Sequence, residues 1–375
     1  MNRIYFDNAA TTPMDPVVVE TMIPFLHTHF GNPSSIYSFG RETRLAIENA
    51  RKKVAELLQA KPGEIFFTSG GTESDNMAIR AAVEDLGCSH IITSPLEHHA
   101  VLHTITTLQK SHGVTVEEVH VLPNGHVDLI DLEKRLAAAK KRCLVSLMHA
   151  NNEIGNLLDI DAVGALCATH QAIFHSDTVQ TVGHYPLNFH RAGVHFATGA
   201  AHKFHGPKGI GILFINESVK VNPMIHGGGQ ERNMRAGTEN VAGIVGFAKA
   251  LEIAYAQLQE DQQHIQQLKS YFATQLQRAI PGVSFNGDWN GQSLYTVLNV
   301  SFPRSDKAEF LLMSLDMQGI CVSAGSACSS GAQQGSHVIQ NIPDRMDGVP
   351  IRFSFSKYNT LAEVDCLVEK LKELL

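Results

Sequence analysis

Residues 195–211 read HFATGAAHKFHGPKGIG, and they decide the predicted fold. Residues 193–198 have the composition of a short strand, and residues 210–215 form a second apolar run. Between the two, small residues lead to Lys203, and the turn-forming residues 206–209 reverse the chain. The sequence therefore predicts a lysine displayed on a tight loop between two buried strands.

The lysine indicates the chemistry of this loop. An amine in a confined site has a lowered pKa and can condense with a carbonyl group, which is how pyridoxal phosphate is held by its enzymes. That cofactor also needs an acid for its ring nitrogen and a cradle of N–H groups for its phosphate. Taken alone, the segment could also be a surface lysine in a glycine-rich turn, so the rest of the chain has to decide.

The lysine loop is similar to that of a known family. Residues 201–203 (AHK) followed by residues 206–209 (GPKG) resemble the cofactor segment of the IscS- and NifS-like cysteine desulfurases of the class V aminotransferase family. The resemblance runs from residues 7–12 (DNAATT) to residues 352–354 (RFS), essentially the whole chain. It implies that the cofactor is pyridoxal 5'-phosphate. It also implies fold type I of the pyridoxal-phosphate-dependent transferases, an α/β fold with a mostly parallel sheet in a large domain and a smaller α+β domain.

The alternation of apolar patterns predicts the same fold class. From Glu64 to Asp177, short apolar runs alternate with helical patterns, which specifies a mostly parallel sheet covered on both faces. Ligands bind such sheets beyond the carboxyl ends of the strands. A helical stretch then runs from residue 239 towards residue 280. We expect a large cofactor-binding domain over residues 14–258 and a small domain made of residues 1–13 and 259–375.

Composition narrows the class of protein further. The 375 residues carry a formal charge of −7 and no basic block, which argues against direct binding of nucleic acid or of an anionic membrane. Neither a signal peptide nor a membrane-spanning run is indicated, so a cytoplasmic location is expected. The 6 cysteines form no Cys-x-x-Cys pair and the histidines lack metal-site spacing, so no metal site is predicted.

Loops that follow the predicted strands carry residues suited to the cofactor. The glycines at residues 70–71 open a helix whose free N–H groups can hold a phosphate. In the resemblance, Lys203 binds the cofactor and shuttles a proton, Asp177 pairs with the ring nitrogen, and His98 stacks on the ring, with His99 as the alternative. The remaining implied cofactor contacts are Gly71, Thr72, Asn152, Gln180, Ala200, His202 and Thr238.

Two of these positions carry further expectations. Ala200 stands where the family usually has serine, whose hydroxyl touches the phosphate, so somewhat weaker cofactor retention is expected. Thr238 resembles a residue that reaches the phosphate in the other subunit, which implies a homodimer with shared sites.

Arg352 is the candidate substrate clamp. It lies on a predicted strand of apolar and small residues, so its guanidinium needs an anionic partner. The resemblance implies that it binds the α-carboxylate of L-cysteine, with Asn152 as a second substrate contact. A structural ion pair is the alternative interpretation of this arginine.

Cys328 separates a desulfurase from its relatives. The chain after Val322 is almost entirely glycine, alanine and serine, which predicts a loop in which a core cysteine would be out of place. The resemblance implies that this thiol takes sulfur from L-cysteine as a persulfide, leaves L-alanine, and passes the sulfur to an acceptor protein. The acceptor would be an iron–sulfur scaffold or a tRNA-thiolating enzyme.

Two other functions compete with this one. Another class V aminotransferase or lyase would share Lys203, Asp177 and Arg352 but would need no reactive thiol. A scaffold that keeps the fold without turnover is disfavoured by the complete set of lysine, acid and carboxylate clamp.

Overall fold

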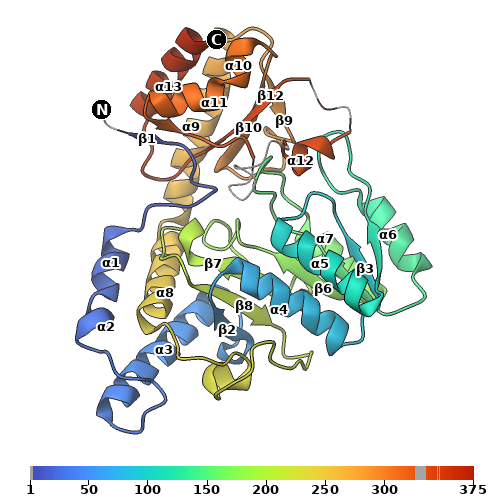
Figure 1. Ribbon diagram of the computed structural model, residues 1–375, viewed down its shortest axis with the longest axis vertical. Helices are drawn as coiled ribbons and strands as arrows, with labels where there is room; N and C mark the ends of the chain where they lie inside the picture. Colours follow the sequence, from blue (N-terminus) through green and yellow to red (C-terminus); the bar gives the residue numbers. More distant parts are fainter. Residues whose placement is uncertain (1–2, 326–334, 344, 346) are drawn as a thin grey trace.

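The computed structural model describes residues 3–325, 335–343, 345 and 347–375. Cys328 lies outside these residues. A larger part contains a seven-stranded sheet flanked by helices. A smaller part, which holds both ends of the described chain, lies against one end of the larger part (Figure 1). The predicted domain boundaries stay a prediction.

The large sheet is mixed but mostly parallel, which confirms the predicted fold class. The central strands are parallel to one another, whereas β8 (Gly211–Ile215) returns directly from β7 (Phe196–Ala200) and is antiparallel to both of its neighbours. In spatial order the strands are β2 (Ile65–Thr68), β8 (Gly211–Ile215), β7 (Phe196–Ala200), β6 (Ile173–Asp177), β5 (Cys143–Ser146), β3 (His90–Thr93) and β4 (Thr115–Glu118).

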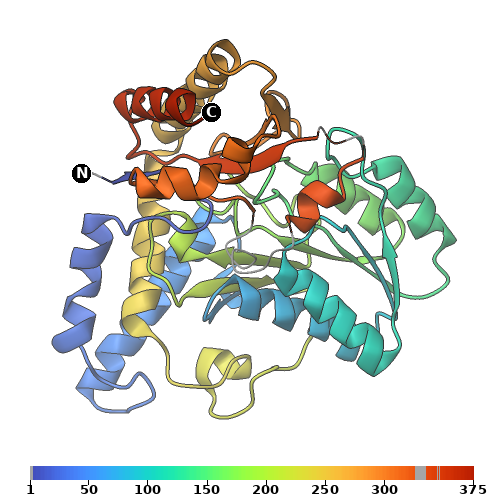
Figure 2. The ribbon, with the colours of Figure 1, turned by 45° about the horizontal axis from the view of Figure 1, so that its top comes forward.

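Both faces of this sheet are buried. Successive side chains of a strand point to opposite faces, so Ile212 and Leu213 of β8 belong to two different hydrophobic cores. The core with Leu213 is closed by α4 (Gly71–Glu84) and α5 (His99–His112), which lie along one face in Figure 2. The opposite core is closed by α1 (Pro16–Met22), α3 (Ser38–Leu57), α6 (Leu129–Ala138), α7 (Ile160–Thr169) and α8 (Val241–Ala256); the short α2 (Pro24–His27) follows α1.

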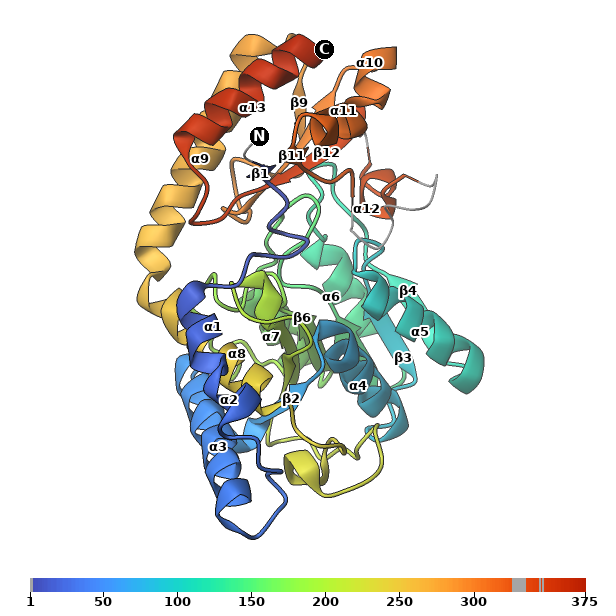
Figure 3. The same ribbon diagram turned by 60° about the vertical axis from the view of Figure 1, so that its left-hand side comes forward.

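The smaller part has its own core, to which Phe6 near the N-terminus and residues 265–371 contribute. Figure 3 shows its two long helices side by side above the N-terminal strand. A capping box formed by Thr360 and Glu363 begins the last helix. The elements are β1 (Ile4–Tyr5), α9 (Leu258–Ala279), β9 (Ser284–Asn286), β10 (Val297–Phe302), α10 (Asp306–Glu309), α11 (Leu311–Met317), β11 (Ile320–Cys321), α12 (His337–Gln340), β12 (Val349–Ser354) and α13 (Leu361–Leu374).

The structure corrects some predicted boundaries. The helical stretch predicted from residue 239 to residue 280 is two helices, α8 and α9, bent by 73° where they meet at Gln257. Strand β10 begins at Val297, and before it the N–H of Leu294 donates a hydrogen bond to the carbonyl oxygen of Gly155. The short strand β9 was not predicted.

Among the described residues, no single helix is long and apolar enough to span a membrane. α8 and α9 pass that test only as a bent pair.

A buried ion pair ties the loop before α8 to the sheet. The guanidinium of Arg51 on α3 makes two hydrogen bonds to the carboxylate of Glu231, at 2.7 and 2.8 Å, and both side chains are almost fully buried. Glu231 also accepts the N–H of Phe67 on β2 at 2.8 Å. Two forked hydrogen bonds and a backbone donor satisfy this carboxylate, so its burial is tolerated.

We expect Glu231→Ala to lower the free energy of unfolding by about 3–5 kcal/mol, because it leaves the buried Arg51 guanidinium with only the partly exposed Glu48 carboxylate as ionic partner among the described residues. Denaturant unfolding of the cofactor-loaded protein measures the change. Glu309→Ala removes an exposed partner of Arg304 and serves as the control, for which little change is expected. Equal losses for the two variants would contradict the importance of the buried pair.

Candidate active site

Lys203 lies on the predicted tight loop. β7 ends at Ala200, a single 3₁₀ turn covers Ala201–Lys203, and β8 begins at Gly211. The Lys203 ammonium donates hydrogen bonds to the carbonyl oxygens of Ala9 at 2.7 Å and Ala10 at 2.9 Å. A segment far away in the sequence therefore closes over the lysine.

The polar loop after β1 is fastened to the lysine loop at several points. The N–H and the hydroxyl of Thr12 both donate to the carbonyl oxygen of His202, at 2.9 and 3.0 Å. The Thr12 hydroxyl in turn accepts the N–H of His205 at 2.8 Å. These bonds hold the carbonyl groups of Ala9 and Ala10 in place around the lysine.

One cavity of about 780 Å³ collects the predicted cofactor and substrate residues. The predicted residues that line it are Gly71, Thr72, His98, Asn152, Asp177, Gln180, Ala200, His202, Lys203 and Arg352. Thr238 is exposed and lies outside this lining, and Cys328 lies outside the described residues. The lining also includes residues that were not predicted: Ala9, Ala10, Asp75, Met148 and Val179.

Asp177 is placed to hold a protonated ring nitrogen. Its Oδ1 accepts the N–H of Val179 at 2.9 Å and lies 3.5 Å from the hydroxyl of Thr198. Within the described part of the chain, no hydrogen bond reaches Oδ2, which leaves this oxygen for the cofactor. Burial is the main cause that raises the pKa of Asp177 to about 6, so the group is still ionised at neutral pH.

The phosphate end of the cavity combines a helix N-terminus with a neutral histidine. α4 begins at Gly71, and Gly70 before it has no side chain to satisfy the first N–H groups of the helix. Burial, and then the positive charge of Lys203, lowers the pKa of His202 to about 4. At neutral pH this imidazole is therefore an uncharged hydrogen-bonding group, with Nδ1 3.2 Å from the Thr11 hydroxyl.

The structure distinguishes the two neighbouring histidines. His98 lines the cavity, and its Nδ1 accepts the N–H of Ala100 at 3.1 Å, which caps α5. Burial lowers the pKa of His98, so the ring is neutral and suited to stacking on an aromatic cofactor. His99 instead stacks on His337 of α12, with the ring centres 4.6 Å apart.

Arg352 has a structural partner and also lines the cavity. Its side chain is 1% exposed; Nη2 lies 2.8 Å from Asp7 Oδ1, and Nη1 donates to the carbonyl oxygen of Asn152 at 2.9 Å. The Nε–H has no hydrogen-bond partner within the described residues. A buried donor of this kind favours a further acceptor, and a substrate carboxylate would supply one.

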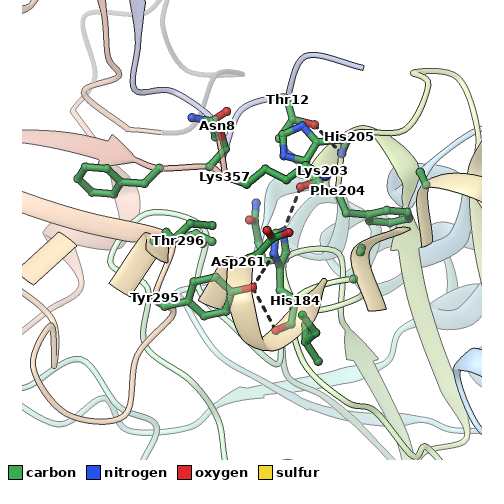
Figure 4. A pocket seen from close by; sticks show the side chains of 18 of the residues that line it. Asn8, Thr12, His184, Lys203, Phe204, His205, Asp261, Tyr295, Thr296 and Lys357 are labelled. Carbon is green, nitrogen blue, oxygen red and sulfur yellow. Dashed lines mark hydrogen bonds between the residues drawn. The ribbon is translucent and has the colours of Figure 1, made fainter. Parts of the chain in front are cut away.

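A second cavity of about 610 Å³ lies on the other side of Lys203, between the two parts of the molecule (Figure 4). Across it, His184 Nε2 lies 3.1 Å from the carbonyl oxygen of Lys203, and the hydroxyl of Tyr295 lies 3.1 Å from His184 Nδ1. His184 thus links the backbone of the lysine turn to a residue that packs into the smaller part. This contact was not predicted, since no local pattern relates residues 184 and 295.

The arrangement fits pyridoxal 5'-phosphate. Lys203 would bind its aldehyde, Asp177 its ring nitrogen, His98 its ring face, and the start of α4 with His202 its phosphate. Ala200 contributes no hydroxyl at that end. When bound, the cofactor withdraws electrons from the substrate carbon that carries the amino group.

Comparisons with known proteins agree with this site. The family model for aminotransferase class V matches residues 4–367. Cysteine desulfurase IscS from Dictyoglomus turgidum is 44% identical over 377 aligned residues, which cover 100% of this chain and 94% of the relative. The chain belongs to the class V aminotransferase family.

Solved structures of class V aminotransferase relatives extend the likeness to the fold. A NifS-like protein is 40% identical, with a TM-score of 0.91 over 99% of both chains. The structure of SspA in complex with cysteine is 30% identical, with a TM-score of 0.80 over 96% of this chain and 100% of that one. These relatives confirm the predicted cofactor and the predicted enzyme class, a pyridoxal-phosphate-dependent cysteine desulfurase.

We expect Arg352→Ala to raise the KM for L-cysteine by about tenfold or more while the visible absorbance of the bound cofactor is retained, because a charge-assisted donor to the substrate is lost. Asp7→Asn is the matched variant, because it weakens the ion pair but keeps the guanidinium. Steady-state kinetics separate the two. If Asp7→Asn raised the KM as much as Arg352→Ala, the arginine would be acting through its structural pair alone.

Proposed function

We propose that this chain converts L-cysteine into L-alanine and carries the sulfur as a persulfide on Cys328 to an acceptor protein. The observation that supports this most is the position of Gly325, which is three residues before Cys328 in the sequence. A Cβ atom on Gly325 would lie 3.5 Å from both the Glu153 carboxylate and the Ser336 side chain. Ser323, two residues before Gly325, exchanges backbone hydrogen bonds with Arg352, which lines the cofactor cavity, so the described chain that leads to Cys328 passes beside that cavity.

The substrate is oriented by charge and then loses and regains protons at defined atoms. Arg352 binds the α-carboxylate, which points the rest of L-cysteine towards Lys203. The Lys203 amine accepts the proton from the α-carbon and later returns one. Asp177 keeps the ring nitrogen protonated throughout, because an ionised carboxylate beside it stabilises the positive charge.

Sulfur transfer is a displacement at the substrate sulfur. The Cys328 thiolate forms an S–S bond to this sulfur while the bond between Cβ and sulfur breaks. The electron pair of the broken bond stays with carbon, and a proton added at Cβ completes the methyl group of alanine. Cys328 is left as a persulfide, whose outer sulfur an acceptor thiolate can attack.

We expect Cys328→Ser to lose at least about 100-fold in alanine production while it still binds the cofactor, because the nucleophile is absent. Mass spectrometry of the parent after L-cysteine treatment should find one added sulfur on the peptide that contains Cys328. Cys321→Ser, at the end of β11, is the control and should keep both properties. Full turnover by Cys328→Ser would favour another class V aminotransferase or lyase reaction.

We further propose that the acceptor is a protein, either an iron–sulfur scaffold or a tRNA-thiolating enzyme, and that the enzyme works in the cytoplasm. The formal charge of −7 without a basic block supports a protein acceptor over direct contact with RNA.

We also propose that the enzyme is a homodimer. Residues 17–45 expose a group of large apolar side chains on α1, on α2, in the loop between α2 and α3 and at the start of α3, among them Leu26 at 66%, Phe30 at 69% and Ile36 at 89% exposed. A contiguous exposed apolar patch of this kind marks an interaction surface. Thr238 does not line the cavity of its own chain, and a second copy would allow it to complete its neighbour's phosphate site.

We expect the double variant Leu26→Glu/Ile36→Glu to be monomeric, because two charges would be buried in the apolar contact. Analytical ultracentrifugation measures the mass of the particle. Met317→Glu changes an equally exposed apolar residue on α11 and should leave the dimer intact. A dimer that survives in the double variant would place the contact on another surface.

A further inference from the structure

Three buried carboxyl groups lie close enough to influence one another near the cofactor acid. They belong to Asp75 on α4, Glu97 before α5 and Asp177 at the end of β6, and their residues are 1%, 1% and 6% exposed. Burial disfavours each anion, and each anion disfavours the others. The three groups therefore do not all ionise at neutral pH.

Asp177 is the group best suited to be the anion. It accepts the Val179 N–H and the Thr198 hydroxyl on Oδ1, it lines the cofactor cavity, and its Oδ2 carries no hydrogen bond within the described residues. Glu97 accepts one N–H, from Met148, and burial raises its pKa well above the usual range. The state of Asp75 is then the remaining question.

Asp75 has two polar neighbours, the Thr198 hydroxyl and the imidazole of His175. Its Oδ1 lies 3.4 Å from Nε2 of His175, and neither atom has a hydrogen-bond partner within the described residues. His175 is fully buried, and its Nδ1 lies 2.8 Å from the hydroxyl of Ser146. A single proton between Asp75 and His175 would satisfy two buried atoms that are otherwise unpaired.

Burial determines whether Asp75 or His175 binds that proton. Burial lowers the pKa of His175 to about 4 and raises the pKa of Asp75 to about 7. The favoured pair is therefore a protonated carboxylic acid and a neutral imidazole, in which Nδ1–H donates to Ser146. Asp75 also lines the cofactor cavity, so a bound cofactor excludes water and disfavours its ionisation further.

We propose that Asp75 is a positioning residue for Asp177: it holds a proton, donates it in a hydrogen bond to His175, and leaves Asp177 as the ionised carboxylate at the cofactor ring. The Thr198 hydroxyl, which can bond to either aspartate, is then directed to Asp177. His175, Asp177 and Glu97 are the titratable groups that face Asp75 in this arrangement. The inference rests on the cofactor site and does not depend on the sulfur acceptor.

Infrared spectroscopy of the holoenzyme tests this assignment directly. With ¹³C in the aspartate side-chain carboxyl groups, a protonated buried aspartic acid gives a carbonyl band that shifts with the label, whereas ionised aspartates and protonated Glu97 do not contribute to it. We expect such a band at neutral pH in the parent and in Glu97→Gln. We expect the band to be absent from Asp75→Asn, which keeps the shape of the side chain but has no proton to lose.

His175→Phe provides a second measurement if Asp75→Asn does not fold. It removes the acceptor but leaves the acid, so the band should remain and move to higher wavenumber. A parent without a label-sensitive band, a band that persists in Asp75→Asn, or an unshifted band in His175→Phe would overturn the proposal. Alanine production by the same parent preparation tests the desulfurase reaction separately, so an active parent without the band would overturn this inference alone.

Discussion

The hydrogen bonds from the Lys203 ammonium to the carbonyl oxygens of Ala9 and Ala10 bring together the segments on which the site depends. The lysine belongs to the turn between β7 and β8 of the large sheet, whereas the two carbonyl groups follow β1, which pairs with β11 of the smaller part. A charged amine in a partly buried site needs acceptors. Those acceptors come from a chain segment that also binds the substrate clamp.

The same N-terminal segment reaches the other side of the cavity. Asp7 pairs with Arg352 and accepts the hydroxyl of Ser323 at 2.8 Å. Ser323, which is five residues before Cys328, in turn exchanges backbone hydrogen bonds with Arg352. The short loop after β1 thus connects Lys203, Arg352 and the chain that leads to Cys328.

Burial sets the charge of each group in the cavity. His98 and His202 are neutral at neutral pH because burial lowers their pKa values. Asp177 accepts hydrogen bonds on Oδ1 from a backbone N–H and a hydroxyl, which stabilise its anion. Arg352 forms an ion pair with Asp7. Interactions between the remaining charges are strong in such an environment, since little water screens them. The site therefore presents separate positive and negative positions to a cofactor that carries both charges.

Local patterns in the sequence determined the order of strands and helices, the lysine turn and the polar residues at strand ends, because apolar periodicity and turn chemistry act over a few residues. They could not reveal Asp75, which reads as an ordinary polar residue of α4, or the Arg51–Glu231 pair, whose members are 180 positions apart. They also left open whether Arg352 has a structural partner, and the tertiary structure placed Asp7 beside it. Contacts of this kind depend on how the sheet, the N-terminal loop and the smaller part meet. The sequence by itself therefore determined the elements and the chemistry of the lysine loop, and the tertiary structure decided which charges face one another.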